Sequence, residues 1–233
     1  MSARRTAVLD SAGAGSDADR HMTRRDLSVI IPAFNVAPYI RESIQTTLEC
    51  ADRLLEVIVV DDGSTDETAR VAASFGDRIV LLRQGNHGPS SARNAGMRVA
   101  HGKYVGFLDG DDPWSAPSPD PRLTALDADP SLGAAYGFTR RFVEDAFGNR
   151  SLAEQTAVGT TALVVRRDLL LTIGGFDERL THGEDLDLMV RLRETGRGLQ
   201  QIDEIVAIAR AHAGSLTSDT SARLGSRFTI GRA

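Results

Sequence analysis

Short apolar segments that alternate with helix-like segments constrain the fold of this chain most strongly. Residues 27–31 (LSVII), 56–60 (EVIVV), 79–82 and 103–108 are short and mainly apolar. Such runs are typical of parallel strands that are covered on both faces. A helix-like segment separates each run from the next, which gives the order β-α-β-α-β-α-β. This order predicts an α/β fold with a doubly wound, mostly parallel sheet and right-handed connections.

Helices are expected over 39–55, 66–75 and 92–100. The first has apolar residues at approximate helical spacing, and Ser64 or Thr65 is expected to cap the second. Pro32 is expected to end the first strand. After residue 114 the pattern is weaker, and the proline-rich segment 115–121 is expected to be irregular. There we predict strands over 133–143, 162–165 and 202–208, a turn over 145–149, and helices over 122–128, 167–173 and 185–194.

The composition is that of a globular chain of one domain. Of the 233 residues 41% are hydrophobic and 25% charged, and the net charge of −5 argues against nonspecific nucleic-acid binding. Cys50 is the single cysteine, so no disulfide forms within the chain; we expect a buried thiol and a reducing, cytoplasmic compartment. No apolar run is long enough for a transmembrane segment. Residues 1–25 are predicted to be a disordered leader, residues 26–220 a single domain, and residues 221–233 a tail.

Three carboxylates follow the predicted strand over 103–108. Asp109, Asp111 and Asp112 are grouped around Gly110, and Pro113 comes next. Ligands of open α/β sheets bind outside the carboxyl ends of the strands. Acids this close raise one another's pKa values unless a cation neutralises them, and oxygen ligands suit Mg²⁺ or Mn²⁺ held together with substrate phosphates. A solvated acidic turn is the alternative interpretation.

Five segments in a fixed order resemble the family 2 glycosyltransferases, which have the GT-A fold and use nucleotide-sugar donors. The resemblance runs from about residue 27 to about residue 217. It implies an inverting, metal-assisted transfer of a sugar from a nucleotide-sugar donor, most often a UDP-sugar, to an acceptor hydroxyl. Residues 26–112 would form the Rossmann-like nucleotide-sugar-binding half, and residues 113–220 the acceptor half. The segments are LSVIIPAFN, EVIVVDDGSTDET, NHGPSSARNAG, GKYVGFLDGDD and GGFDERLTHGEDLDLMVRL.

The resemblance assigns the nucleobase to the loop after the first strand, which here is Pro32, Ala33 and Phe34. Phe34 would stack on the base, although a core aromatic is the alternative. Asp62 would contact uracil and ribose, with Asp61 nearer the strand end. These two acids could instead serve as helix caps, but Ser64 and Thr65 already offer that function.

The resemblance also implies how the diphosphate is held. Arg93 matches a position that contacts the pyrophosphate, and a cation at a helix start beside glycine-rich amides suits that ligand. An exposed helix arginine is the alternative. Asp109-Gly110-Asp111 matches the DxD motif of the family, with Asp111 as the metal ligand and Asp109 on the ribose or on a metal-bound water. Asp112 is an alternative ligand.

Glu184 and Asp185 match an acidic pair at a helix start, in which Asp185 would be the general base for the acceptor hydroxyl. Stabilisation of the helix N-terminus is the alternative role. His212 resembles a late histidine that some members place near the metal or phosphates, and an ordinary histidine is equally compatible with the pattern. His87 is interpreted as a loop residue.

Two other functions fit parts of the pattern. One is a catalytically silent nucleotide-sugar-binding module, which the intact acids argue against. The other is a nucleotidyltransferase, which usually has a glycine-rich basic loop after the first strand; IIPAFN has neither feature. The acceptor (saccharide, lipid-linked or small molecule) and the oligomeric state are not specified. A lipid-linked acceptor would bring the protein to the inner face of the membrane.

Overall fold

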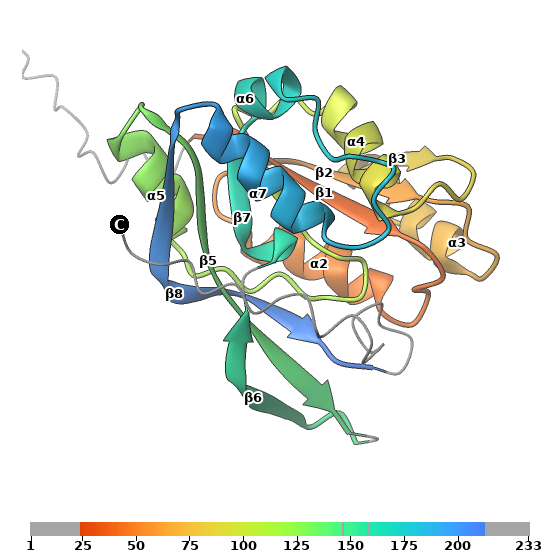
Figure 1. Ribbon diagram of the computed structural model, residues 1–233. Helices are drawn as coiled ribbons and strands as arrows, with labels where there is room; N and C mark the ends of the chain where they lie inside the picture. Colours follow the sequence, from red (N-terminus) through yellow and green to blue (C-terminus); the bar gives the residue numbers. More distant parts are fainter. Residues whose placement is uncertain (1–23, 146, 158, 213–233) are drawn as a thin grey trace, which may run out of the picture.

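A single mixed sheet with helices on both faces forms the body of the protein (Figure 1). The structure is a computed structural model, and it describes residues 24–145, 147–157 and 159–212. Within these ranges eight strands lie in the order β3-β2-β1-β4-β7-β5-β6, and β8 pairs with β5. The tail over 221–233 and almost all of the predicted leader lie outside the described residues.

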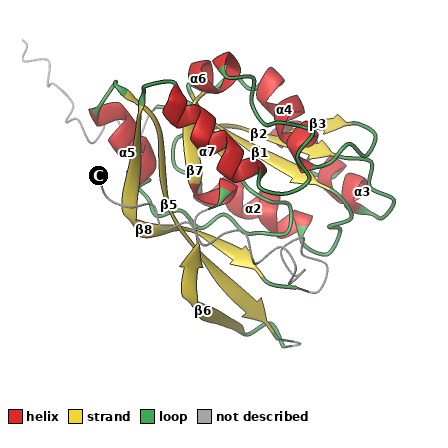
Figure 2. Ribbon diagram, in the orientation of Figure 1, coloured by secondary structure: helices red, strands yellow, loops and turns green. Residues whose placement is uncertain are grey.

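The first half of the sheet is parallel throughout, as predicted. The central strand β1 lies between β2 and β4, and β3 pairs with the outer edge of β2, all in parallel. Figure 2 shows the helices that connect these strands. The elements are β1 (Leu27–Ala33), α2 (Ile40–Cys50), β2 (Leu54–Asp61), α3 (Thr68–Ala73), η1 (Gly76–Arg78), β3 (Val80–Arg83), α4 (Pro89–Val99) and β4 (Tyr104–Phe107).

Two details of this half differ from the prediction. Pro32 does not end β1: it pairs with Val60 of β2, whereas the pairing of β1 with β4 stops at Ile30. A proline is tolerated there because the ladder on the β4 side has already ended. Neither Ser64 nor Thr65 caps α3, which begins at Thr68; its first backbone N–H donates to Asp66 instead (2.9 Å).

The second half of the sheet is mixed. Strand β7 is antiparallel to both β4 and β5, β6 is antiparallel to β5, and β8 is parallel to β5. The β5–β6 hairpin extends away from the layered body (Figure 1). Strand β6 was not predicted. The elements are α5 (Pro121–Ala128), β5 (Leu132–Glu144), β6 (Arg150–Ala157), η2 (Thr160–Ala162), β7 (Leu163–Arg166), α6 (Arg167–Thr172), α7 (Glu184–Glu194) and β8 (Gly198–Arg210).

The core lies on both faces of the sheet. In β1, Val29 and Ile31 pack toward α2, α3 and α5, whereas Ile30 between them packs toward α4, α6 and α7. This alternation follows from the two-residue period of a strand. It explains why the parallel strands are continuously apolar, and it leaves their carboxyl ends as the polar edge at which a site can form.

A buried ionic cluster joins the opposite, amino-terminal ends of the strands. Arg53 donates to Asp26 (2.7 Å) and to Asp127 (2.6 Å), and the hydroxyl of Tyr104 donates to Asp127 (2.6 Å). The Arg53 side chain is only 1% exposed. The cluster therefore ties β1, β2 and β4 to α5 on the side away from the predicted site.

Two further predictions concern the surface. Cys50, expected to be buried, is exposed at the end of α2. It follows the last buried residue of that helix, Thr47, by three positions. Over the described ranges, no helix combines the length and the apolar character that crossing a bilayer requires.

Candidate active site

The loops after β1, β2 and β4 contact one another at the carboxyl edge of the sheet. The backbone N–H of Asp62 donates to the carbonyl of Ala33 (2.8 Å). Gly110 lies so close to β1 that an added Cβ would be 2.9 Å from the carbonyl oxygen of Pro32 and 3.4 Å from the Cα of Ala33. The carbonyl of Gly110 also accepts from the buried hydroxyl of Ser43 on α2 (2.9 Å). The structure thus brings three of the predicted segments together.

The loop after β1 presents an aromatic ring to solvent. Phe34 is 43% exposed, which excludes the core-aromatic alternative. Asn35 follows in a left-handed conformation (φ 52°), and its side-chain oxygen accepts from the N–H of Thr65 (2.9 Å). Pro32 and Ala33 are buried within β1. The loop is therefore fastened to the turn after β2 while its ring stays accessible.

Asp61 and Asp62 are both buried and already hydrogen-bonded. Asp61 accepts from the N–H of Ser64 (3.2 Å) and from Arg83 (3.1 Å). Asp62 accepts from the backbone N–H groups of His87 (3.0 Å) and Gly88 (2.7 Å). The carboxylate of Asp62 thus holds the loop before α4 and does not cap helix α3.

Arg93 on α4 joins two of the predicted acidic segments. Its Nη2 lies 2.8 Å from Asp109, its Nη1 lies 3.1 Å from Glu184, and its guanidinium stacks on the ring of Phe176 (5.3 Å). The side chain is 5% exposed, which excludes the alternative of an exposed helix arginine. The predicted contact with a pyrophosphate is untested, whereas the bridge between β4 and α7 is observed.

Asp111 faces His212, although 101 positions separate them. The Nε2 of His212 lies 2.8 Å from the Oδ2 of Asp111. Burial raises the pKa of Asp111, and the negative charge of Asp109 raises it further. Burial and the charges of both neighbouring acids also raise the pKa of Asp112 well above its usual range. Asp112 is almost fully buried and accepts from the backbone N–H of Arg210 (2.6 Å). This hydrogen bond anchors the end of β8.

Some of these groups are also of the type that binds divalent metal ions. Within the described ranges no group of three or more His, Cys, Asp or Glu side chains has the arrangement of a complete metal site. Asp111 and His212 nevertheless supply an oxygen and a nitrogen in one place, and the charge of Asp109 acts on the same carboxylate. Burial raises the pKa values of Asp111 and Asp112 most, and neighbouring acids raise them further; a bound cation would offset this second contribution. The donor set therefore fits a divalent cation completed by a substrate.

Glu184 and Asp185 begin α7, as predicted. Glu184 is held by Arg93, whereas Asp185 accepts from the backbone N–H of Leu186 (2.7 Å). Burial raises the pKa of Asp185, and the charge of Glu184 adds to the increase. A half-buried carboxylate with a raised pKa is suited to accept a proton.

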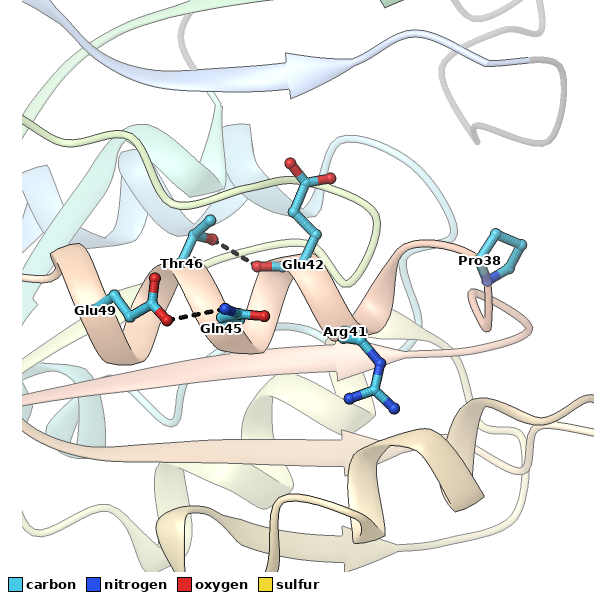
Figure 3. Close-up of a pocket in the computed structure, with 6 residues that line it drawn as sticks. All are labelled: Pro38, Arg41, Glu42, Gln45, Thr46 and Glu49. Carbon is cyan, nitrogen blue, oxygen red and sulfur yellow. Dashed lines mark hydrogen bonds between the residues drawn. The ribbon is translucent and has the colours of Figure 1, made fainter. Parts of the chain in front are cut away.

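Two surface pockets lie near these residues. A pocket of about 180 Å³ lies beside the Asp111–His212 pair and is lined by Tyr39, Glu144, Asp145, Arg210, Ala211 and His212. A second, of about 310 Å³, lies on the outer face of α2 and contains none of the predicted site residues. Figure 3 shows that within it Arg41 and Glu42 point to opposite sides of the helix. Glu42 contacts Arg210, so it connects this surface to the site.

Comparison with known proteins identifies the family. The sequence profile described as "Glycosyl transferase family 2" matches residues 28–184, more than half of the chain. The chain belongs to glycosyltransferase family 2. The predicted family is therefore confirmed, and the matched range contains every predicted site residue except Asp185 and His212.

Relatives within the family match over different lengths. The hyaluronan synthase of Pasteurella multocida is 31% identical over 193 residues, which are 77% of this chain and 20% of that protein. EpsJ of Bacillus subtilis, described as an uncharacterized glycosyltransferase, is 42% identical over 89 residues, 37% of this chain and 26% of that protein. The chain thus spans about a fifth to a quarter of the length of these relatives.

Solved structures with the same fold confirm the predicted GT-A architecture. One is TarS 1–349 of S. aureus in complex with UDP-GlcNAc, with a TM-score of 0.65 at 22% identity. The match covers 83% of this chain and 61% of the TarS chain. The mannosyltransferase PcManGT of Pyrobaculum calidifontis, in complex with GDP-Man and Mn²⁺, has a TM-score of 0.64 at 23% identity, with coverages of 84% and 59%.

Several residues of this site were not predicted. Asn94 exchanges two hydrogen bonds with the backbone of Phe176 (2.8 and 2.9 Å), which holds the segment before α7. Asn94 directly follows Arg93 in the segment NHGPSSARNAG, so its place beside a predicted site residue was a signal that the sequence offered. Tyr39 lies against the ring of His212, and the guanidinium of Arg210 lies over Tyr39. The sequence offered no signal for Tyr39, whereas Arg210 lies two residues before the predicted His212.

Proposed function

We propose that this chain is a catalytic domain that transfers a sugar from a nucleoside-diphosphate sugar to an acceptor hydroxyl with inversion at the anomeric carbon. The observation that carries the proposal is the bridge of Arg93 between Asp109 and Glu184. It joins the candidate donor-binding acids to the segment that holds the candidate base. The family match supports the same reaction class.

The donor would lie across the carboxyl edge of the sheet. Phe34 is accessible for stacking on the base, and the hydrogen bonds of Asp61 and Asp62 hold the turn after β2 and the loop before α4. A uridine nucleotide is proposed; TarS is in complex with UDP-GlcNAc and PcManGT with GDP-Man, so the screen described below compares both bases. Arg93 contributes positive charge near the diphosphate position.

Asp111, Asp109 and His212 are the residues proposed to hold Mg²⁺ or Mn²⁺. We favour Asp111 over Asp112 because Asp112 is engaged by the backbone of Arg210 and is almost fully buried. When bound, a divalent cation would supply positive charge to the departing diphosphate.

Asp185 is proposed as the base that removes the acceptor proton. Its carboxylate is half-buried, and its raised pKa brings it closer to the range in which proton transfer is efficient. A hydroxyl deprotonated there would attack the anomeric carbon from the face opposite the diphosphate, which inverts that centre. Glu184 is held by Arg93 and would fix the start of α7, so that Asp185 faces the acceptor.

The experiment begins with a thermal-shift screen of UDP-, GDP- and other nucleotide sugars in the presence of Mn²⁺. Release of nucleoside diphosphate from the best donor is then measured with and without a chelator, using water and a panel of saccharide, lipid-linked and small-molecule acceptors. Chelator-sensitive release supports the proposal. Binding without release would indicate a silent module, and pyrophosphate formation from a sugar phosphate and a nucleoside triphosphate would indicate a nucleotidyltransferase.

A cytoplasmic location, with attachment at the inner membrane face if the acceptor is lipid-linked, also remains a prediction. Fractionation of cells that express the full-length protein tests it. Recovery in the soluble cytoplasmic fraction, or in a salt-extractable membrane fraction, is expected.

A further inference from the structure

Arg210, the last residue of β8, is enclosed at the junction of four segments. Its side chain is 5% exposed. Its backbone N–H donates to Asp112 (2.6 Å), and its Nε donates to the backbone carbonyl of Asp111 (3.0 Å). One residue therefore fixes the end of β8 to the acidic loop after β4 through both its main chain and its side chain.

The rest of the guanidinium is directed to α2 and to the β5–β6 hairpin. Nη1 lies 2.6 Å from Glu144, and Nη2 pairs with Glu42. The guanidinium also lies over the rings of Tyr39 (4.9 Å) and Phe142 (4.8 Å). A planar guanidinium has five donors and can stack, so it satisfies these partners at once as no other side chain can.

His212 follows two residues later and depends on the same partners. Its ring pairs with Asp111 and lies against Tyr39, with ring centroids 4.8 Å apart. Arg210 contacts both of these residues. The geometry points to Arg210 as a positioning residue that aligns His212 with Asp111, so that the two form a preformed oxygen–nitrogen pair. The metal-binding part of this inference rests on the proposed function; the alignment of the two side chains does not.

Arg150 on β6 provides a matched control. It pairs with the same two acids as Arg210, Glu42 and Glu144 (2.8 Å to the latter), and it also lies over the ring of Phe142 (4.9 Å). In the part of the chain that the structure describes, Arg150 makes no hydrogen bond, ion pair or ring contact with Asp111, Asp112 or Tyr39. Loss of Arg150 therefore removes the link between hairpin and helix but leaves the contacts to the acidic loop.

The test compares Arg210→Met, Arg210→Lys and Arg150→Met by two measurements. The first is the nuclear Overhauser contact between the Tyr39 and His212 rings in the metal-free protein, with His212→Gln used to assign the histidine signal. The second is the affinity for Mn²⁺ alone, by calorimetry. Loss of a residue that holds a metal ligand in place typically weakens metal affinity about 10–100-fold.

We expect Arg210→Met to lose the ring contact and to weaken Mn²⁺ binding at least about tenfold, whereas Arg150→Met retains both. Arg210→Lys keeps the positive charge and the apolar stem but lacks the forked guanidinium donors. It replaces the methionine variant if that variant does not fold. We expect Arg210→Lys to show the same two losses with a near-native melting temperature. An unchanged ring contact in a folded Arg210 variant would overturn the inference, as would equal losses in Arg150→Met.

The two proposals fail in different ways. If the wild-type protein binds Mn²⁺ but transfers no sugar, the proposed reaction is wrong and the role of Arg210 is still decided by both measurements. If it binds no Mn²⁺, the ring contact alone decides that role.

Discussion

At the residue scale, the acids of the candidate site are held by two partners from distant parts of the chain, Arg93 and His212. Arg93 is bound by Asp109 and Glu184, and Asp111 is paired with His212. Within the residues that the structure describes, no cationic side chain pairs with Asp185, and its pKa is raised by burial and by Glu184. It is therefore the acid best placed to exchange a proton.

Asp185→Asn should retain donor binding and lose most sugar transfer, by about two to four orders of magnitude, because the amide cannot accept the acceptor's proton. Donor affinity by calorimetry and the turnover rate check this. The control is Asp187→Asn in the same first turn of α7, where the acid pairs with Arg191 (2.6 Å) and transfer should persist. Full activity of Asp185→Asn would remove this residue from the mechanism.

The pH dependence of kcat/KM provides a second prediction. Transfer needs ionised Asp185, so a raised pKa places the acid limb of the profile above the range of an ordinary aspartate. Glu184→Gln removes the neighbouring negative charge, which lowers the pKa of Asp185, and the limb should move to lower pH. The measurement is the pH at which kcat/KM falls to half of its plateau, not the plateau value itself. A limb that does not move contradicts the assignment.

Asp111→Ala should weaken the donor affinity that depends on Mn²⁺ about tenfold or more, because an oxygen ligand is lost. Donor titrations with and without Mn²⁺ check this, and the exposed acid Asp77 on η1 provides the control variant Asp77→Ala. An unchanged affinity in Mn²⁺ would count against a ligand role for Asp111.

At the element scale, close contacts between backbone segments set the geometry of the site. The loop after β4 lies against the end of β1 at Gly110, and the segment before α7 is held to α4 by Asn94. Gly175 is required in that segment: it has φ +70°, and an added Cβ would lie 2.3 Å from the side-chain oxygen of Asn94. Together with the Arg93 bridge, these contacts connect the acidic loop to the segment that carries the candidate base.

Gly110→Ala should destabilise the fold by about 1–3 kcal/mol, because the new methyl group would meet the backbone of β1. Urea unfolding measures the free energy, and Mn²⁺ affinity should decline with it. Gly159→Ala is the matched control: its backbone is extended (φ −152°) and an added Cβ meets nothing within 4 Å. Equal stability of the two variants would contradict the close-contact argument.

At the scale of the whole molecule, the candidate active site lies at one edge of the sheet and an ionic cluster lies at the opposite edge. The cluster of Asp26, Arg53, Tyr104 and Asp127 lies at the amino-terminal ends of the strands. Burial opposes ionisation of Asp127, but the hydrogen bonds from Tyr104 and Arg53 outweigh it and hold the pKa of this carboxyl well below its usual range. This edge therefore contributes stability that depends on pH.

The direction of this pH dependence follows from the difference between the pKa of Asp127 in the folded and in the unfolded state. Because the pKa of Asp127 is lower in the folded state, its contribution is complete above the unfolded value of about 3.9 and is lost as the pH falls below it. Asp127→Asn should therefore be less stable than the wild type near neutral pH, and the difference should shrink as the pH falls from 5 toward 2. Urea unfolding across this range checks the trend; a constant difference would contradict it.

The sequence by itself determined the parallel half of the sheet and the acids at its carboxyl edge, because both are local patterns: continuous apolar runs, helical spacing, and polar residues directly after a strand. It did not reveal β6, whose residues RSLAEQTA have no continuous apolar run and which is paired only because β5 lies beside it. The partners of Arg93 and Arg210 were decided by the tertiary structure alone. Arg93 and Glu184 are 91 positions apart, and Arg210 and Glu42 are 168 apart. Such pairs form where packed elements bring side chains together, and no spacing along the chain records that.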